Sequence, residues 1–145
     1  MATKTHKMLV DLIARKMREK GYTIVAMEGN FLGSWETEEM PIPLKIRRHR
    51  PDLIGIRMNT KKICIGEAKT SSDLFSKRTT DQFNDFSSIV GKTSGEKAEL
   101  IIGIPLLARD KLFHLLKSLS LPLDEVSIVI LPEELVGDEN EEDII

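Results

Sequence analysis

Two short fragments, Pro51-Asp52 and Glu67-Ala68-Lys69, carry residue types that can bind a divalent cation and activate water. Carboxylate oxygens are hard ligands that suit Mg²⁺ or Mn²⁺, ions that keep several waters and accept phosphate oxygens from a substrate. A lysine side chain beside such an ion can orient a metal-bound water or, as the neutral amine, deprotonate it. If Asp52, Glu67 and Lys69 lie together, the chemistry they support is metal-assisted cleavage of a phosphodiester bond.

The two fragments flank a segment that the sequence predicts to be a β-hairpin. The first fragment opens the apolar run Leu53–Ile56, the second closes the run Ile63–Gly66, and a polar turn around Asn59-Thr60 separates them. Counting outward from this turn pairs position 52 with position 67. Residues opposed across antiparallel strands point to the same face, with Cβ atoms about 4.5–5.5 Å apart. The two carboxylates are therefore expected to share one small space.

The lysine is expected to complete this group. Side chains alternate along a strand, so Lys69 should lie on the same face as Glu67 while Ala68 points away. Both flanking runs are apolar on both faces, as in strands covered by helices. Charged residues at the ends of such buried strands are more typical of a functional site than of an exposed surface. The structural alternative is that Asp52 binds local amides at a strand start, and that Glu67 and Lys69 form an exposed charge pair. A register shifted by one residue would separate the carboxylates onto opposite faces.

In spacing and residue type these fragments resemble the PD-(D/E)XK superfamily, which includes many restriction endonucleases, archaeal Holliday junction resolvases and repair nucleases. The resemblance implies that Asp52 and Glu67 bind Mg²⁺ or Mn²⁺ and that Lys69 is the catalytic lysine. It also implies the main-chain carbonyl of Ala68 as a third metal ligand. The resemblance covers about residues 7 to 104.

Gln82, the only glutamine in the chain, is a further candidate for the site. It falls on the helix expected after the Glu67 strand, where several branches of the superfamily place a glutamine in a Q-x-x-x-Y pattern near the active site. Phe86 stands here where the tyrosine would be, which removes a phenolic donor. The alternative for Gln82 is a solvated helix residue.

The element order predicted from apolar periodicity is α-β-β-β-α-β-α-β, which is the order of the common core of the superfamily with one further helix and strand. It predicts a three-layer α/β sandwich with a central mixed β-sheet and a restriction endonuclease-like fold. One domain over residues 1–132 is expected, followed by an acidic tail over 133–145. Besides the hairpin, the predicted elements are a helix over 7–20, a strand over 22–28, a helix over 73–90, a strand over 98–104, a helix from Pro105 and a strand over 126–131.

A basic segment leads into Asp52 and is a candidate for nucleic-acid binding. Its cationic residues are Lys45, Arg47, Arg48, His49 and Arg50. Such side chains neutralise backbone phosphates without reading the base sequence, and their position would bring a strand to the site. The alternative is a solvated basic loop. His49 is also a candidate general base, although a histidine among arginines is more typical of a phosphate or structural contact.

The charge of the chain is unevenly distributed. The net charge is −2, and the acidic tail contains seven acids and no base, so the rest of the chain has a net charge of +5. The tail either competes with nucleic acid for a basic face or promotes solubility. The acids of the tail are Glu133, Glu134, Asp138, Glu139, Glu141, Glu142 and Asp143.

Several single residues have roles that the sequence leaves open. Asp11, Glu19 and Glu28 are acids that could join the metal site or lie exposed. Trp35 could stack on a base or pack against the core or a partner. Cys64 lies inside an apolar run and is expected to be a buried, reduced thiol.

These observations lead to three hypotheses of different classes. The first is a Mg²⁺-dependent nuclease that hydrolyses phosphodiester bonds in DNA. The second is a catalytically inactive, nuclease-fold module that binds nucleic acid in a larger complex, and the third is a structural protein whose charges form an ion-paired sheet end. A homodimer would suit cleavage of both strands of a duplex. Because no segment has the length of a membrane span or the pattern of a signal peptide, a cytoplasmic protein without a membrane partner is expected.

Overall fold

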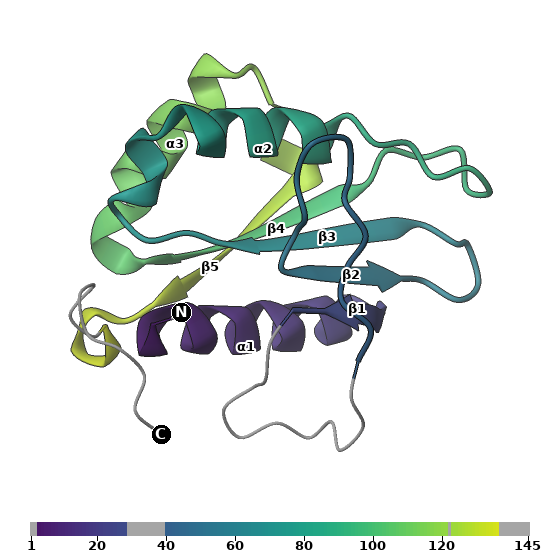
Figure 1. Cartoon of the computed structure of the whole chain (residues 1–145), viewed down its shortest axis with the longest axis horizontal. Coiled ribbons are helices and arrows are strands. Elements are labelled where there is room, and N and C mark those ends of the chain that lie inside the picture. The colour runs from purple at the N-terminus through teal and green to yellow at the C-terminus, as the bar shows by residue number, and fades with distance from the viewer. Residues whose placement is uncertain (1–2, 29–39, 122, 137–145) are drawn as a thin grey trace.

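A mixed β-sheet forms the centre of the molecule, and its strands follow one another in space in the same order as in the sequence (Figure 1). The computed structural model describes residues 3–28, 40–121 and 123–136. Neighbouring strands are antiparallel from β1 to β3 and parallel from β3 to β5. Within the described ranges the strands are β1 (Thr23–Met27), β2 (Leu53–Ile56), β3 (Ile63–Ala68), β4 (Glu99–Pro105) and β5 (Val126–Leu131).

Helices cover both faces of the sheet, as Figure 1 shows. Helix α1 (Lys4–Glu19) lies on one face, and α2 (Lys77–Ser87) and α3 (Arg109–Ser118) lie on the other. Each face has its own cluster of buried apolar side chains. The prediction of an α/β protein with a mixed sheet and the order α-β-β-β-α-β-α-β is thus confirmed. No helix in the part of the chain that the structure describes is long and apolar enough to span a membrane.

Helix α1 packs unusually close to the sheet because the strands beneath it carry glycines. A Cβ atom built on Gly66 would lie 2.6 Å from Cγ2 of Ile13, and one on Gly103 would lie 2.9 Å from Cδ1 of the same isoleucine. Contacts this short do not occur between real side chains, so only glycine permits the observed approach. The close packing fixes the height and angle of α1, whose first turn reaches the end of the sheet near Asp52.

The helix expected over residues 73–90 is divided and shorter. A 3₁₀ turn covers Asp73–Phe75, and α2 begins only after Ser76, which has extended dihedral angles and accepts a hydrogen bond from the main-chain nitrogen of Thr79 at 3.1 Å. A serine in this conformation is an N-cap, which ends the preceding turn and starts a new helix. As a result Phe75, expected on the apolar face, is 73% exposed.

The helix expected from Pro105 also begins later. Pro105 has extended dihedral angles and ends β4, a 3₁₀ turn follows at Leu106–Ala108, and α3 starts at Arg109. The sequence suggested a helix start at Pro105 because the φ angle of proline suits a first helical turn. The same φ angle also suits the extended end of a strand. The parallel pairing of Pro105 with Leu131 in β5 keeps it in the sheet.

Candidate active site

The hairpin register places the two acidic fragments opposite each other. Leu53 of β2 pairs with Gly66 of β3, so the next position outward opposes Asp52 to Glu67, as the count from the turn predicts. The main-chain nitrogen of Asp52 donates to Oε1 of Glu67 at 3.1 Å, and that of Ala68 donates to Oδ2 of Asp52 at 2.8 Å. Each carboxylate therefore accepts a hydrogen bond from the main chain of the opposite fragment, and the two are locked together.

The carboxyl group of Glu67 is buried and that of Asp52 is largely buried, with 13% of its side chain exposed, and their pKa values move in opposite directions. Burial, together with the negative charge of Asp52, raises the pKa of Glu67 well above its ordinary value. Burial acts on Asp52 in the same sense, but a hydrogen bond and charge from His6 and the amide of Ala68 outweigh it and lower the pKa of Asp52. Two carboxylates in one small site repel, so Glu67 is the member of the pair that retains a proton most readily.

Lys69 joins this pair from the position just after β3. Its Nζ lies 3.1 Å from Oε2 of Glu67 and donates a short hydrogen bond to Oε1 of Gln82, and only 7% of Lys69 is exposed. The main-chain nitrogen of Lys69 donates to the carbonyl oxygen of Gly103 at 2.9 Å, which continues the sheet past the end of β3. The ammonium is thus held between a strand and a helix rather than exposed as a surface charge.

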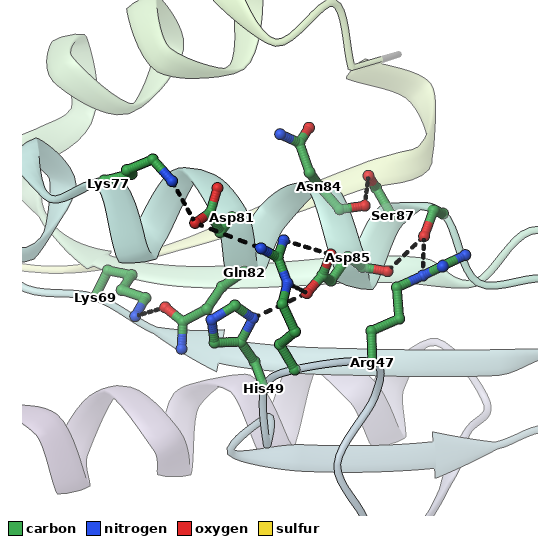
Figure 2. A network of polar contacts seen from close by, with 11 residues as sticks. Arg47, His49, Lys69, Lys77, Asp81, Gln82, Asn84, Asp85 and Ser87 are labelled. Atoms are coloured by element: carbon green, nitrogen blue, oxygen red, sulfur yellow. Dashed lines mark hydrogen bonds and ion pairs between the residues drawn. The ribbon is translucent and has the colours of Figure 1, made fainter.

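Gln82 is buried on α2 and points at Lys69, as Figure 2 shows. This position contradicts the alternative of a solvated helix residue. Phe86, one turn later, is fully buried in the apolar cluster between α2 and the sheet. A tyrosine hydroxyl at that position would have needed a partner inside the cluster, so phenylalanine is the residue that the packing accepts.

His6 belongs to the site but was not identified from the sequence. It lies in the first turn of α1, with Nε2 at 3.5 Å from Oδ2 of Asp52. Burial lowers the pKa of His6, but the hydrogen bond and charge of Asp52 outweigh it and raise the pKa overall. The sequence places His6 at the start of an amphipathic helix without indicating that this helix end lies beside Asp52.

The other acids considered from the sequence lie elsewhere. Asp11 pairs with Arg15 at 3.1 Å, and Glu19 lies 3.9 Å from Lys16, both along the surface of α1. Glu28 is next to Asp52 through its main chain, because its nitrogen donates to the carbonyl oxygen of Asp52 at 2.9 Å, but Glu28 is exposed. Asp11 and Glu19 are therefore engaged outside the site.

The donor set of Asp52 and Glu67 fits a hard divalent cation. The raised pKa of Glu67 shows that Lys69 offsets only part of the cost of burying this carboxylate beside Asp52. Within the described ranges no cluster of three or more histidine, cysteine, aspartate or glutamate side chains could hold a metal ion. A cation at this place would have the carboxylates of Asp52 and Glu67 as its charged ligands, and Mg²⁺, which keeps several waters, tolerates such a sparse set of protein ligands.

The basic segment is held against α2, and we call residues 45–50 the basic strap. A bridge between Ile46 and His49 folds it into a tight turn. Arg48 donates to both carboxylate oxygens of Asp85, at 3.2 and 3.1 Å, and Nδ1 of His49 lies 3.0 Å from Oδ2 of the same residue. Arg47, at the tip of the turn, donates to Oγ of Ser88 at 3.0 Å (Figure 2). The strap is therefore not a freely solvated loop.

These contacts divide the cations of the strap into two groups. Arg48 and His49 are committed to Asp85, so the partner of His49 is this carboxylate rather than Lys69 or the acidic pair. Lys45 and Arg50 are exposed and form no ion pair with any residue that the structure describes. Lys45, Arg50 and Arg47, whose contact with Ser88 is a hydrogen bond to a neutral hydroxyl, can bind an external anion without breaking an ion pair between described residues.

The remaining predictions concern Cys64, Trp35 and the acidic tail. Cys64 is a free, buried cysteine, as expected, and burial raises the pKa of its thiol. Trp35 and residues 137–145 of the acidic tail lie outside the described residues. Glu133, at the start of the tail, accepts a hydrogen bond from the main-chain nitrogen of Leu107 at 3.3 Å.

The chain was compared with protein-family models, with curated proteins and with solved structures, and none of them matches it.

Proposed function

We propose that this protein is a metal-dependent nuclease that hydrolyses phosphodiester bonds in DNA and has the restriction endonuclease-like fold of the PD-(D/E)XK superfamily. The observation that supports the proposal most strongly is the convergence of Asp52, Glu67 and Lys69 in one buried group at the end of the hairpin. The amide of Gln82 contacts this group from the helix that follows. Asp52, Glu67 and Lys69 are also the residues whose types and spacing resemble the PD-(D/E)XK superfamily.

The arrangement suggests a division of roles. Mg²⁺ or Mn²⁺, held by the carboxylates of Asp52 and Glu67 and the main-chain carbonyl of Ala68, would polarise the phosphate and make water a stronger nucleophile. Lys69 would orient the attacking water and offset the negative charge that develops on the phosphate. Gln82 accepts from the Lys69 ammonium and so fixes its direction. His6 holds Asp52 in position through their contact at the start of α1.

Cleavage assays on matched variants test this proposal. Wild-type protein with Mg²⁺ or Mn²⁺ is expected to cut one or more of duplex, single-stranded and branched DNA, with RNA of the same sequence assayed in parallel. Asp52→Asn should lower the cleavage rate by at least about 100-fold, because the substitution removes a metal ligand and nearly preserves volume. Asp110→Asn is the control, since the side chain of Asp110 is 88% exposed on α3. Equal rates for wild type and Asp52→Asn would refute the proposed site.

A second candidate is a catalytically inactive module that binds nucleic acid as part of a larger complex. The observation in its favour is that the charges of the site already satisfy one another. Lys69 bonds to Glu67 and Gln82, and Asp52 bonds to His6 and the amide of Ala68. Salt-sensitive DNA binding with neither Mn²⁺ binding nor cleavage would select this candidate. Mn²⁺-dependent cleavage that disappears in Asp52→Asn would exclude it.

A further inference from the structure

Asp85 is a nearly buried acid whose contacts lie outside the proposed catalytic group. It is 7% exposed, on the side of α2 that meets the basic strap. Its carboxylate binds the guanidinium of Arg48 in a bidentate fashion and also contacts His49. Hydrogen bonds from Arg48 lower the pKa of Asp85, so the group remains ionised near neutral pH. A paired acid in this position fixes the strap to the helix.

Helix α2 connects this anchor to the candidate active site. Gln82 bonds to Lys69, and Asp85 follows three residues later, a spacing that places two side chains on neighbouring parts of one helix face. Figure 2 shows Lys69 and Gln82 beside His49 and Asp85 on the same side of α2. The helix is a rigid element, so the position of the strap relative to the Lys69 ammonium is set by these contacts.

Exposed cations lie on the strap and on the hairpin that follows α2. Lys45 and Arg50 lie on the strap itself, and the contact of Arg47 with Ser88 brings the tip of the strap to the end of α2. The rise from Gln82 to Ser88 along the helix is about 9 Å, which corresponds to between two and three phosphates of a duplex strand. Lys92 and Lys97 are exposed on the hairpin that follows α2.

We propose that Asp85 is a positioning residue that fixes the basic strap as a binding arm for the phosphate backbone of DNA beside the scissile bond. Lys45, Arg50 and the free donors of Arg47 contact the phosphates, and Asp85 acts through Arg48 and His49 without touching the substrate. This role rests on the proposed function, since it assumes that DNA reaches Lys69. Its value is preorganisation: an arm that is already held in place loses less conformational entropy when it binds.

The sign of one substitution distinguishes positioning from simple electrostatics. Asp85→Asn removes a negative charge beside the strap, so a purely electrostatic surface should bind DNA equally well or more tightly. Positioning by Asp85 predicts the opposite, a dissociation constant about tenfold higher, because the strap loses its anchor. The measurement is fluorescence anisotropy with a labelled DNA duplex in EDTA, where no cleavage occurs. Asp110→Asn makes the same change of charge on exposed α3 and should not weaken binding.

Two further variants keep the test decisive if Asp85→Asn is poorly folded. Arg48→Lys preserves the positive charge, and the side chain of Arg48 is 61% exposed, so the substitution is easily accommodated. The lysine ammonium cannot replace the bidentate contact of Arg48 with Asp85. It should weaken DNA binding by about fivefold, whereas a charge-only surface would be unaffected. Asp85→Glu retains the carboxylate and should bind DNA more tightly than Asp85→Asn. Thermal unfolding of every variant establishes that the compared proteins are folded.

The two proposals fail in different ways. Wild-type affinity in both Asp85→Asn and Arg48→Lys would overturn the role of Asp85, whatever the cleavage assays give. DNA binding that depends on Asp85, without any metal-dependent cleavage, would overturn the nuclease and leave the positioning of the strap intact. Lys45→Ala and Arg50→Ala identify the side chains that touch DNA, since removing one phosphate-binding cation should reduce the slope of log affinity against log salt by about 0.9.

Discussion

At the scale of single residues, the surroundings of Glu67 disfavour the ionised form of its carboxyl group. The carboxyl group is 3% exposed and faces Asp52, and both conditions raise its pKa. Lys69 offsets part of this penalty at 3.1 Å from Oε2. Perturbed acids of this kind cluster at functional sites because a ligand or substrate supplies the missing charge. A positive charge that approached the two acids would lower the pKa of Glu67.

Substitutions at Lys69 and Gln82 test the roles of the two residues separately. Lys69→Met should lower the single-turnover cleavage rate by about 100- to 10,000-fold, the range expected when a group that transfers or orients a proton is removed. Gln82→Ala should lower it by only about tenfold, because Lys69 keeps its ion pair with Glu67. Rates measured with saturating Mg²⁺ and excess enzyme give the comparison. A Gln82→Ala rate as low as that of Lys69→Met would instead assign the amide a direct contact with the substrate.

At the scale of elements, polar contacts hold α1 to the sheet at both of its ends. His6 meets Asp52 at the first turn, and Lys20, just past the last turn, forms an ion pair with Glu99 of β4. Tyr22 and Ser127 also donate to Glu99, at 2.9 and 3.1 Å. Close packing on Gly66 and Gly103 fixes the middle of the helix between these ends. The position of His6 therefore depends on contacts along the whole of α1.

The Glu99 network makes stability depend on pH. Burial acts to raise the pKa of Glu99, but hydrogen bonds from Lys20 and Tyr22 outweigh it, so the folded pKa lies below the ordinary glutamate value of 4.5. A depressed carboxyl pKa stabilises the fold above the unfolded pKa, and this contribution is lost as pH falls through 4.5 and below the folded pKa. Glu99→Gln should reduce the free energy of unfolding by about 2 kcal/mol near neutral pH.

Urea denaturation from neutral to acidic pH measures both effects. The difference in stability between wild type and Glu99→Gln should shrink as pH falls, because the protonated wild type also lacks the carboxylate. Glu96→Gln is the control, since Glu96 is exposed on the hairpin after α2. A constant difference at all pH values would contradict an ionised role for Glu99.

The elements themselves were predictable where a single local pattern decided them. The strand expected over 126–131 has the same bounds as β5, because a short run that is apolar except for Ser127 and rich in β-branched residues is enough to define it. Pro105 suited both a strand end and a helix start, and pairing with β5 decided between them. Ser76 could continue a helix or cap one, and its extended dihedral angles made it a cap.

At the scale of the whole molecule, the candidate site lies where separate elements meet. The start of β2, the end of β3, the first turn of α1 and the middle of α2 each contribute side chains. An ion that binds there binds the folded protein and not the unfolded chain, since only the fold brings Asp52 and Glu67 together. Metal binding should therefore stabilise the entire domain by mass action.

Thermal unfolding with and without metal tests this linkage. At a free Mn²⁺ concentration about 100 times the dissociation constant, wild type should gain about 2.7 kcal/mol. For a chain of this size that is a rise in Tm of roughly 5–10 °C. EDTA should reverse the rise, and Asp52→Asn should show little of it. An equal rise in Asp52→Asn would place the stabilising ion elsewhere on the protein.

Local sequence patterns were enough to predict the order of the elements, the register of the hairpin and the grouping of Asp52, Glu67 and Lys69. Each of these follows from short-range rules, because side chains alternate along a strand and a short turn fixes which residues oppose each other. Folding in three dimensions was needed to bring His6 to Asp52, separated by 46 positions, and the basic strap to Asp85, 36 positions from His49. Those contacts depend on how whole helices pack against the sheet, which no local pattern encodes.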